Sequence, residues 1–218
     1  VPLDTFGVQS IEDLYRGMGR IQWEAFLTPQ DTLAIRCTLN TPHLDHSQFA
    51  AQKAKDAIVD RFRAKYGQRP SVDVEDPTLR IHLHLIGDQC HVSLDSSGTS
   101  LHERGYRTGT GSAPINEVLA AGMVQLTGWD RMRPLVDPMC GSGTIAIEAA
   151  QIAAGIAAGS QRSFGFERLK PFVRADWLAI KAEAAQAALA AQNAKNTSET
   201  TIFGSDVAHR MVDFAQRN

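Results

Sequence analysis

The sequence predicts two domains of different class: an α+β domain, followed by the N-terminal part of an α/β domain with a doubly wound, Rossmann-like sheet. Three observations carry this prediction. Residues 79–95 alternate between apolar and polar side chains on either side of a Gly-Asp turn, which is typical of a β-hairpin. Beyond residue 103 the composition changes to Ala-rich helical runs. Between these runs, the apolar residues 135–136 lead through Asp137 into a Gly-Ser-Gly turn and a second Ala-rich run, which together predict strand, glycine turn and helix.

In chain order, the first domain is predicted to consist of a helix, a strand, a second helix and three further strands. Ser10 precedes an acid by three residues, at Asp13, which is typical of a helix N-terminus. The second helix is expected to open at Asp45 or Ser47 and to be stopped by Gly67. Strands are expected where apolar and polar side chains alternate, over residues 32–39, 71–74, 79–85 and 90–95.

Each of the two helices carries an apolar stripe that predicts its buried face. The stripe of the first helix comprises Ile11, Leu14, Tyr15 and Met18. The stripe of the second helix comprises Phe49, Ala54, Ile58 and Phe62. Trp23 and Phe26 are expected to pack beneath the first helix.

The second domain is predicted to alternate helices and strands. A helix is expected over residues 113–126, with Pro114 in its first turn. Further helices are expected over 144 to about 158, over 177–194 and from 207 onward. Residues 196–199 are expected to form a loop and 200–203 the second strand. The aromatic and charged segment 161–167, with Pro171 and Phe172, is expected to cap the ligand crevice or to pack on the sheet edge.

The glycine turn is the strongest functional signal in the sequence. Gly141 and Gly143 allow the backbone to approach a ligand closely, and the amides of the following helix N-terminus favour electronegative groups. A nucleotide-like cofactor is therefore expected, and two candidates fit. A nicotinamide dinucleotide requires an acid at the end of the next strand, roughly 20 residues on. Residues 162–166 lie at roughly that distance from the glycine turn, and they do not form a strand that ends in an acid.

The run Asp-Pro-Met-Cys-Gly-Ser-Gly-Thr, from Asp137 to Thr144, instead resembles the first motif of class I S-adenosylmethionine-dependent methyltransferases. In these enzymes the glycine turn passes the methionine part of the cofactor, and an acid at the end of the second strand binds the ribose hydroxyls. Asp206 occupies the corresponding position after the second predicted strand. The resemblance therefore favours S-adenosylmethionine over a nicotinamide cofactor.

Composition narrows the possible partners. The chain has 22 basic and 24 acidic residues, a formal net charge of −2, so any nucleic-acid contact must come from a local basic patch. Such a patch is predicted on the second helix and just beyond it, at Lys55, Arg61, Arg63, Lys65 and Arg69. A solvated helix face without a ligand is the alternative interpretation. The sequence contains no apolar run of ~18 residues, the length that would predict a membrane span. No signal peptide is visible.

The Cys and His residues indicate no metal site. Cys37, Cys90 and Cys140 are odd in number and scattered, which suits a reducing cytosol. His82 and His84 share one strand face, but no third ligand accompanies them, so a polar strand face is predicted. Cys140 lies near a helix N-terminus, where the pKa of a thiol can fall. Without an identifiable base it is predicted to be a packing residue and not a nucleophile.

Several segments together carry a resemblance to one family over nearly the whole chain. Residues 55–62, 69–73 and 93–107 resemble a THUMP RNA-binding domain. Residues 113–121, 137–144 and 204–206 match the catalytic domain of the same proteins. The chain is thus similar to the bacterial THUMP-domain 23S ribosomal RNA guanine-N2 methyltransferases, members of which are often labelled N6-adenine DNA methylases.

The resemblance implies a domain order and a reaction. Residues 1–10 would be the tail of a ferredoxin-like domain, 11–103 the THUMP domain and 104–218 the incomplete methyltransferase domain. S-adenosylmethionine would be the cofactor, and the acceptor would be the N2 amine of a guanine in large-subunit ribosomal RNA, in the cytoplasm. The family's catalytic Asn-Pro-Pro-aromatic motif does not occur in this sequence. No residue of this chain is therefore expected to be catalytic, and the chain is expected to be an inactive fragment of a longer protein.

The resemblance also assigns roles to individual residues. Asp137 would lie near the methionine amino group, and Thr144 would help to hold the carboxylate. Asp206 would accept both ribose hydroxyls, although Ala208 stands where relatives often carry a second acid. The full cofactor set is Asp137, Pro138, Cys140, Gly141, Gly143, Thr144 and Asp206. Arg104 and Arg107 are expected to contact RNA or the cofactor loop, or to bridge the two domains.

Two rival functions stay open. The first is a DNA adenine-N6 methyltransferase, against which the THUMP resemblance argues. The second is a non-catalytic RNA-binding module that keeps a vestigial cofactor fold. Asp137 could then serve only to cap the following helix, and the glycines would form an ordinary turn.

Overall fold

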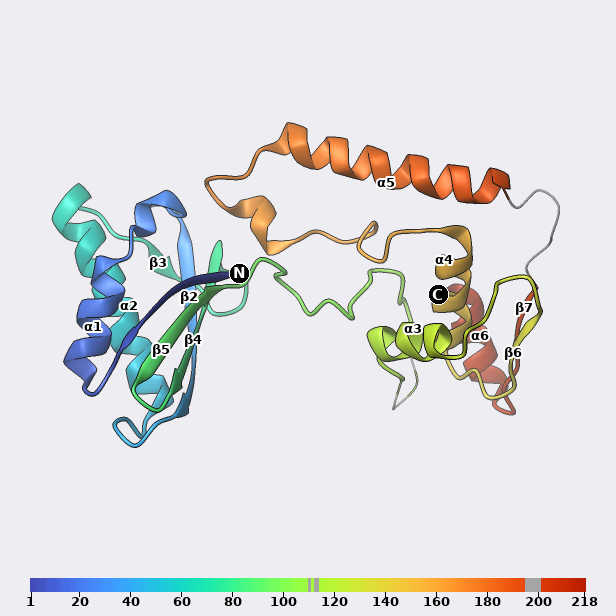
Figure 1. The fold of residues 1–218 in the computed structure, drawn as a ribbon, viewed down its shortest axis with the longest axis horizontal. Helices are drawn as coiled ribbons and strands as arrows, with labels where there is room; N and C mark the ends of the chain where they lie inside the picture. The colour runs from blue at the N-terminus through green and yellow to red at the C-terminus, as the bar shows by residue number, and fades with distance from the viewer. Residues whose placement is uncertain (110, 112–113, 195–200) are drawn as a thin grey trace. The chain divides into compact units, whose positions relative to one another are not determined.

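The computed structural model describes residues 1–109, 111, 114–194 and 201–218. The chain forms two units, which are described separately below (Figure 1). The first unit comprises Val1–Thr99 together with Phe164–Phe172. The second comprises Ser100–Ser163 and Val173–Asn218.

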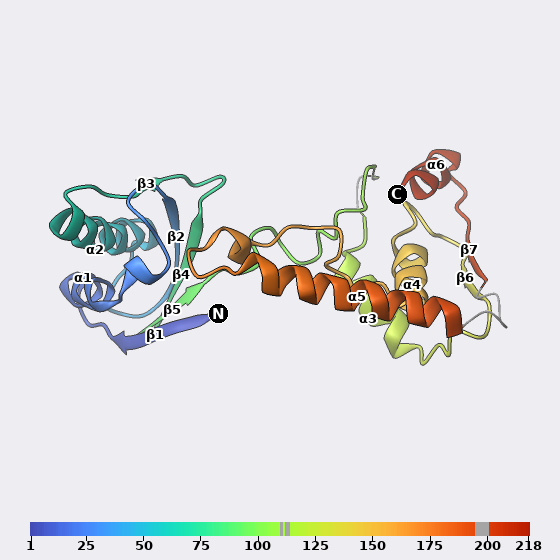
Figure 2. The ribbon, with the colours of Figure 1, turned by 90° about the horizontal axis from the view of Figure 1, so that it is seen from above.

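The first unit is a five-stranded sheet with two long helices. Its strands are β1 (Pro2–Gly7), β2 (Thr32–Asn40), β3 (Ser71–Val72), β4 (Leu79–Ile86) and β5 (Gln89–Leu94), in the spatial order β1-β5-β4-β2-β3. Strand β2 runs parallel to β3 and β4, whereas β4–β5 and β5–β1 are antiparallel pairs. Helices α1 (Ile11–Arg20) and α2 (Ser47–Tyr66) lie side by side on one face of the sheet (Figure 2).

Local signals in the sequence position these elements. The side chain of Ser10 accepts a hydrogen bond from the backbone N–H of Asp13, which caps α1 as predicted. Gly67 ends α2 in the left-handed conformation at φ 66°, a backbone geometry that glycine adopts without a Cβ penalty. The alternation in β4 places Ile81 and Leu83 in the core, where they pack with the helices. The predicted strands of this unit are therefore confirmed, although β3 spans only two residues.

Two predicted core residues lie at the surface. Phe49 is 48% exposed, and the first turn of α2 instead buries Ala50. Tyr15 is 36% exposed because its hydroxyl donates to Asp60 Oδ2 at 2.9 Å, which holds the ring at the rim of the core. Gly17 takes the buried place on α1, where the ring of Phe6 leaves no room for a Cβ. The predictions for Phe49 and Tyr15 were therefore wrong.

Residues 164–172 pack on the first unit even though they follow it far along the chain. They contain the short 3₁₀ helix η2 (Gly165–Arg168), and Phe166 N–H donates to the carbonyl of Ser96 at 3.0 Å. Leu169 packs against the first core, and Lys170 Nζ donates to the carbonyl of Glu24 at 2.9 Å. The sequence analysis expected this segment at the crevice or the sheet edge of the second domain, whereas Phe164–Phe172 belong to the first unit.

The second unit contains a short parallel strand pair and four helices within its described residues. The elements are α3 (Glu117–Leu126), β6 (Leu135–Asp137), α4 (Thr144–Ala154), α5 (Arg174–Ala194), β7 (Ile202–Gly204) and α6 (His209–Arg217). Strands β6 and β7 pair in parallel, with Leu135 opposite Ile202 and Asp137 opposite Gly204. None of the helices in the described part of the chain is long and apolar enough to span a membrane.

Some element boundaries differ from the predicted ones. Helix α3 begins three residues after Pro114, because the side chain of Asn116 accepts from the N–H groups of Val118 and Leu119 and so caps the helix there. Helix α4 ends at Ala154, since Gly155 adopts the left-handed conformation at φ 68°. Ala113, the predicted loop 196–199 and Thr200 lie outside the described residues.

Candidate functional site

The candidate site lies where β6 passes through the glycine turn into α4. Gly141 and Gly143 both have positive φ, 53° and 83°, which side-chain-bearing residues rarely adopt. A Cβ at Gly143 would also lie 2.9 Å from the Cβ of Ala215 on α6. The turn therefore depends on glycine at position 143 for both backbone conformation and space. Cys140 closes it by accepting the N–H of Gly143 at its carbonyl, at 2.8 Å.

Asp137, the last residue of β6, carries an unpaired acceptor. The residue is 9% exposed, and its Oδ1 accepts the backbone N–H of Met139 at 3.1 Å. Its Oδ2 is buried and has no hydrogen-bond partner among the described residues. Leaving a buried carboxylate oxygen unpaired costs free energy, so this atom is placed to receive a donor from a ligand.

Asp206 is brought to the same turn by the parallel pairing of β6 and β7. Its Oδ2 accepts the N–H of Gly141 at 3.0 Å, and its Oδ1 accepts the N–H of Ala208 at 2.8 Å. Each carboxylate oxygen has two lone pairs, so both keep capacity for another donor. The backbones of the two strand ends are also joined, since Cys140 N–H donates to Ser205 O and Ser205 N–H donates to Asp137 O.

A pocket of about 400 Å³ opens at this turn. Of the residues predicted for a cofactor, Asp137, Cys140, Gly141, Thr144 and Asp206 line it. Pro138 and Gly143 belong to the turn but do not line the pocket. Ile115 and Met211 also line the pocket, although no sequence pattern predicted a site role for them. The volume lies within the range of about 300–1,000 Å³ that is usual for small-molecule sites.

Cys140 is a packing residue of this site and not a nucleophile. Its side chain is buried, and burial, with the nearby charges of Asp137 and Asp206, raises the pKa of the thiol above its usual value. The raised pKa keeps the sulfur protonated at neutral pH, which is the opposite of what a nucleophile needs. Its Sγ lies 3.6 Å from the carbonyl oxygen of Gly141.

Residues 104–107 are attached to the helices of the second unit by buried ion pairs. Arg107 donates through Nε to Glu117 Oε1 at 2.9 Å and through Nη2 to the Thr144 hydroxyl at 3.0 Å. Arg104 Nε lies 3.5 Å from Glu148 Oε1, which also accepts the Tyr106 hydroxyl at 3.1 Å. Glu117 and Glu148 are 5% and 2% exposed. Burial raises the pKa of Glu148 despite these partners, and it also raises the pKa of Tyr106.

These contacts connect Arg107 to the helix that begins at the glycine turn. No sequence signal identified Glu117 or Glu148 as partners, because both lie on Ala-rich helices where an acid is equally consistent with an exposed position. Arg104 and Arg107 thus have internal carboxylate partners, and their charge is largely neutralised within the second unit.

The basic residues predicted on α2 mostly have acidic neighbours as well. Glu24, which is buried, accepts from Arg61 Nε at 2.9 Å and from Lys65 Nζ at 3.0 Å. Burial acts to raise the pKa of Glu24, but the two cations outweigh it and lower the pKa to about 2. The remaining pairs are Arg63 with Asp60 at 3.0 Å and Lys55 with Asp56 at 2.6 Å, while Arg69 is exposed.

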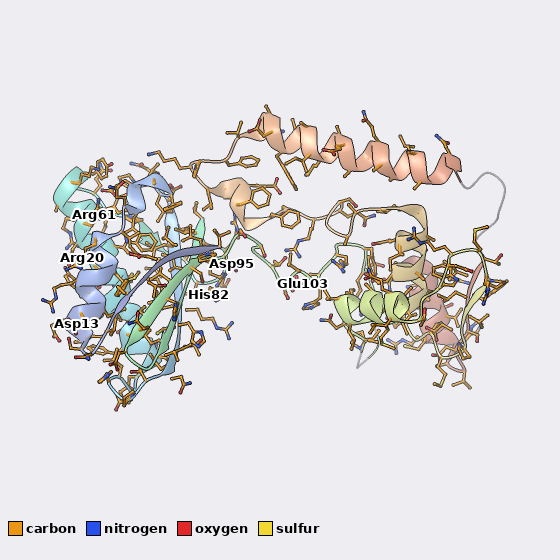
Figure 3. All side chains as sticks on the ribbon, in the orientation of Figure 1. Asp13, Arg20, Arg61, His82, Asp95 and Glu103 are labelled. Atoms are coloured by element: carbon orange, nitrogen blue, oxygen red, sulfur yellow. The ribbon has the colours of Figure 1, made fainter. Side chains whose placement is uncertain are left out.

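Within the described residues, no three His, Cys, Asp or Glu side chains gather closely enough to hold a metal ion. His82 and His84 point away from the buried residues Ile81 and Leu83 of the same strand. Figure 3 shows Asp13, Arg20 and Arg61 on the helical side of the sheet and His82 on the other side.

Comparison with known families matches both parts of the chain. Residues 104–218 match the family model described as "RMKL-like, methyltransferase domain". Residues 8–95 match the model described as "THUMP domain". The sequence prediction of a THUMP domain followed by a methyltransferase domain is thereby confirmed.

Curated relatives and solved structures extend this similarity. Two proteins named ribosomal RNA large subunit methyltransferase K/L, from Photobacterium profundum and Psychromonas ingrahamii, are each 42% identical over 99% of this chain. The crystal structure of SMU.472 complexed with SAH shares 30% identity with a TM-score of 0.82. A predicted N6-adenine-specific DNA methylase from Listeria monocytogenes shares 29% identity with a TM-score of 0.85. Both structures are matched over 99% of this chain.

The chain is shorter than all of these relatives. It spans 30% and 28% of the two K/L proteins. It spans 55% and 56% of the two solved chains.

Proposed function

Because the chain belongs to the family of RMKL-like methyltransferase domains, we propose that it is part of an S-adenosylmethionine-dependent methyltransferase that modifies large-subunit ribosomal RNA. The two relatives named for that activity support the substrate, and the THUMP match supports contact with RNA by the first unit. The proposed methyl acceptor is the exocyclic N2 amine of a guanine. The sequence resemblance to the guanine-N2 methyltransferases supports this choice. A cytoplasmic location is proposed on the same basis.

The buried, unpaired Oδ2 of Asp137 is the observation that carries the cofactor assignment. An ammonium group donates strongly to a carboxylate, and the pairing would relieve the cost of burying that oxygen alone. Asp206 lines the same pocket with lone pairs to spare for the two ribose hydroxyls. The residues present therefore fit S-adenosylmethionine, and SAH in the structural relative SMU.472 is its demethylated form.

S-adenosylmethionine would supply a methyl group that its sulfonium already activates. The residues of this chain then have to bind and orient the cofactor. Positioning of the reacting groups can by itself account for a large share of catalysis. Asp137 would hold the methionine amino group and Asp206 the ribose hydroxyls, and the Gly141–Gly143 turn would allow the close approach of the ligand. Arg107 fixes the Thr144 hydroxyl at the start of α4, on the wall of the pocket. No residue of this chain is assigned a catalytic role.

RNA contact is proposed for the first unit. The α2 patch of Lys55, Arg61, Arg63, Lys65 and Arg69 stays the contact predicted from the sequence, as do Arg104 and Arg107 in the second unit. Contacts to phosphates release counterions, so affinity should fall steeply as salt rises. A salt-independent affinity for structured RNA would contradict this mode of binding.

Binding of SAH to the 218-residue chain tests the cofactor assignment. Ligand-observed NMR at high ligand excess should detect weak binding, and Asp137→Asn should weaken it about tenfold or more, because one charge-assisted hydrogen bond is lost. Asp206→Asn should weaken it as well. Asp130→Asn changes an exposed acid that does not line the pocket and serves as the control. Equal SAH binding by all four proteins would refute the assignment.

The two rival functions differ in acceptor and in turnover. One relative, from Listeria monocytogenes, is named as a predicted N6-adenine-specific DNA methylase. RNA and DNA should therefore be compared as methyl acceptors. Methyl-transfer assays of the same protein with ribosomal RNA and with adenine-containing DNA would distinguish the proposed function from the first rival, a DNA adenine-N6 methyltransferase. The chain alone should show no turnover, so methyl transfer to ribosomal RNA by these 218 residues would contradict the absence of catalytic residues.

A further inference from the structure

The sheet of the first unit has one face covered by α1 and α2 and a second face rich in His and Arg. We call this second face the open sheet face and define it by the outward side chains of three neighbouring strands. These are Arg36 and Thr38 on β2, Arg80, His82 and His84 on β4, and His91 and Ser93 on β5. Successive side chains of a strand point to opposite faces of the sheet, so the side chains of the open sheet face do not pack against α1 and α2.

The strand register brings the cationic side chains of this face together. Arg36 lies directly opposite His82, and His84 lies between Thr38 on one side and His91 on the other. Directly opposed residues of an antiparallel pair, as His84 and His91 are, have Cβ atoms about 4.5–5.5 Å apart. Arg36, His82, His84 and His91 therefore form one cluster, and Arg80 precedes His82 by two residues on the same strand face.

The cations at the centre of this cluster have no internal partners. The side chains of Arg36, His82 and His84 make no hydrogen bond or ion pair within the described residues. His91 Nδ1 lies 3.1 Å from the Thr5 hydroxyl, and Arg80 donates to the carbonyls of Val74 and Glu75. On α2, by contrast, Lys55, Arg61, Arg63 and Lys65 each pair with a carboxylate.

Carboxylates lie only at the margins of the open sheet face. The outward positions of β2, β4 and β5 hold none. Asp95, just after β5, accepts the N–H groups of Ser97 and Gly98. Asp4 on β1 is in register with Val92, a core position, and Asp88 accepts from His43 and Gln9. The cluster is therefore free to receive an external anion.

We propose that the open sheet face binds RNA through phosphate contacts made by Arg36, His82 and His84, and that this binding strengthens as pH falls. The proposal deepens the proposed function, on which it rests, by assigning the main RNA contact of the first unit to the sheet; the α2 patch is the alternative contact that the test compares with it. Histidine ordinarily gains its charge between pH 5 and 8. A sheet face that carries several histidines should therefore bind a polyanion more tightly as pH falls.

Titration of a labelled ribosomal RNA hairpin against the 218-residue chain tests the proposal. The open-face variant is Arg36→Gln, His82→Gln and His84→Gln. The matched helix-face variant is Lys55→Ala, Arg63→Ala and Arg69→Ala, which also removes three cations and leaves the Glu24 pairs intact. Since all six side chains are outside the core, circular dichroism and thermal unfolding should show both variants folded.

The expected result has a pH signature. The wild type should bind about five- to tenfold more tightly at about pH 5.5 than at about pH 8, and the open-face variant should lose this difference. In plots of log affinity against log salt, the open-face variant should have a shallower slope than the wild type at both pH values, because phosphate contacts are lost. The helix-face variant should keep the pH dependence.

Two outcomes would overturn the proposal, and they differ in what else they affect. If the open-face variant binds like the wild type at both pH values while the helix-face variant is weakened, RNA lies on α2 and the proposed function stands. If the wild-type chain binds the hairpin at neither pH, the open-face proposal and the RNA contact of the first unit both fail.

Discussion

Glu24 is a buried acid whose charge is retained by two neighbouring cations. Arg61 and Lys65 both donate to its carboxylate, and Arg61 also donates to the carbonyl of Gly19 at 3.0 Å on α1. Arg61 thus joins α2 both to Glu24, which follows α1, and to the C-terminal end of α1 itself. A carboxylate whose pKa is lowered on folding stabilises the folded state at every pH above its unfolded value.

Replacement of this acid should have a pH-dependent cost. Glu24→Gln should lower the free energy of unfolding at pH 7 by on the order of 2 kcal/mol, discounted for the partial exposure of Lys65. The contribution of the charged carboxylate to the wild type is complete above 4.5, the ordinary pKa of a glutamate side chain, and is lost as pH falls through the folded pKa of about 2. Urea denaturation at pH 7 and near pH 2, followed by Trp23 fluorescence in a Trp129→Phe, Trp177→Phe background, measures the difference. A Glu24→Gln penalty that is equal at both pH values would show that the charge is not the source of stability.

At the scale of single elements, α3 is the helix whose start depends on one side chain. Asn116 satisfies two of the N–H groups that a helix N-terminus leaves unpaired. The first helical residue, Glu117, is the buried partner of Arg107. The cap therefore also sets the position of an ion pair that reaches the wall of the candidate pocket.

Loss of this cap should loosen α3. Asn116→Ala should cost about 1 kcal/mol, whereas Asn116→Ser keeps an acceptor and should cost only a few tenths. Amide hydrogen exchange of peptides from α3 should accelerate about fivefold in the alanine variant, as expected for that free energy. Equal exchange in the alanine and serine variants would show that Asn116 does not hold the helix start.

The sequence predicted elements well where local chemistry decides and poorly where a distant contact decides. The alternation of β4, the Ser10 cap and the glycine turn are local, and all appear in the structure as predicted. Pro114 suggested a helix start that the stronger cap at Asn116 displaced. Phe49 fits a helical stripe by spacing, but only the position of the neighbouring helix decides that Ala50 is buried instead.

The candidate site divides in the same way. The strand-turn-helix motif brings Asp137 and the glycines together without help from elsewhere. Asp206 was predicted from the resemblance to class I methyltransferases, in which an acid ends the second strand, and β7 does lead into it. The pairing of Arg107 with Glu117 and Thr144 joins three segments, and no periodicity in the sequence carries that information.

At the scale of the whole molecule, the two units have separate cores but interleaved sequences. The buried core of the first unit contains only residues up to Leu94, and Leu169 packs against it from the later segment. The start of η2 is so closely packed that a Cβ at Gly165 would lie 2.9 Å from the backbone N of Gly98.

A substitution in the later segment should therefore destabilise the first unit. Leu169→Ala should lower its free energy of unfolding by about 1 to 2 kcal/mol, at the low end for leucine because the side chain is only partly buried. Trp23 fluorescence in the Trp129→Phe, Trp177→Phe background reports this unit, and hydrogen exchange of α3 reports the second. Leu189→Ala, an exposed leucine on α5, is the control. An effect confined to α3 would contradict the assignment of residues 164–172 to the first unit.

The interleaving has a consequence for how the chain is made. A ribosome releases the sheet and both helices of the first unit well before it has synthesised Phe164–Phe172. The emerging unit must wait with the surface beneath Leu169 uncovered while most of the glycine-turn region is translated. Its final closure thus comes after the start of its neighbour, so the two units complete their folding in overlapping and not successive order during synthesis.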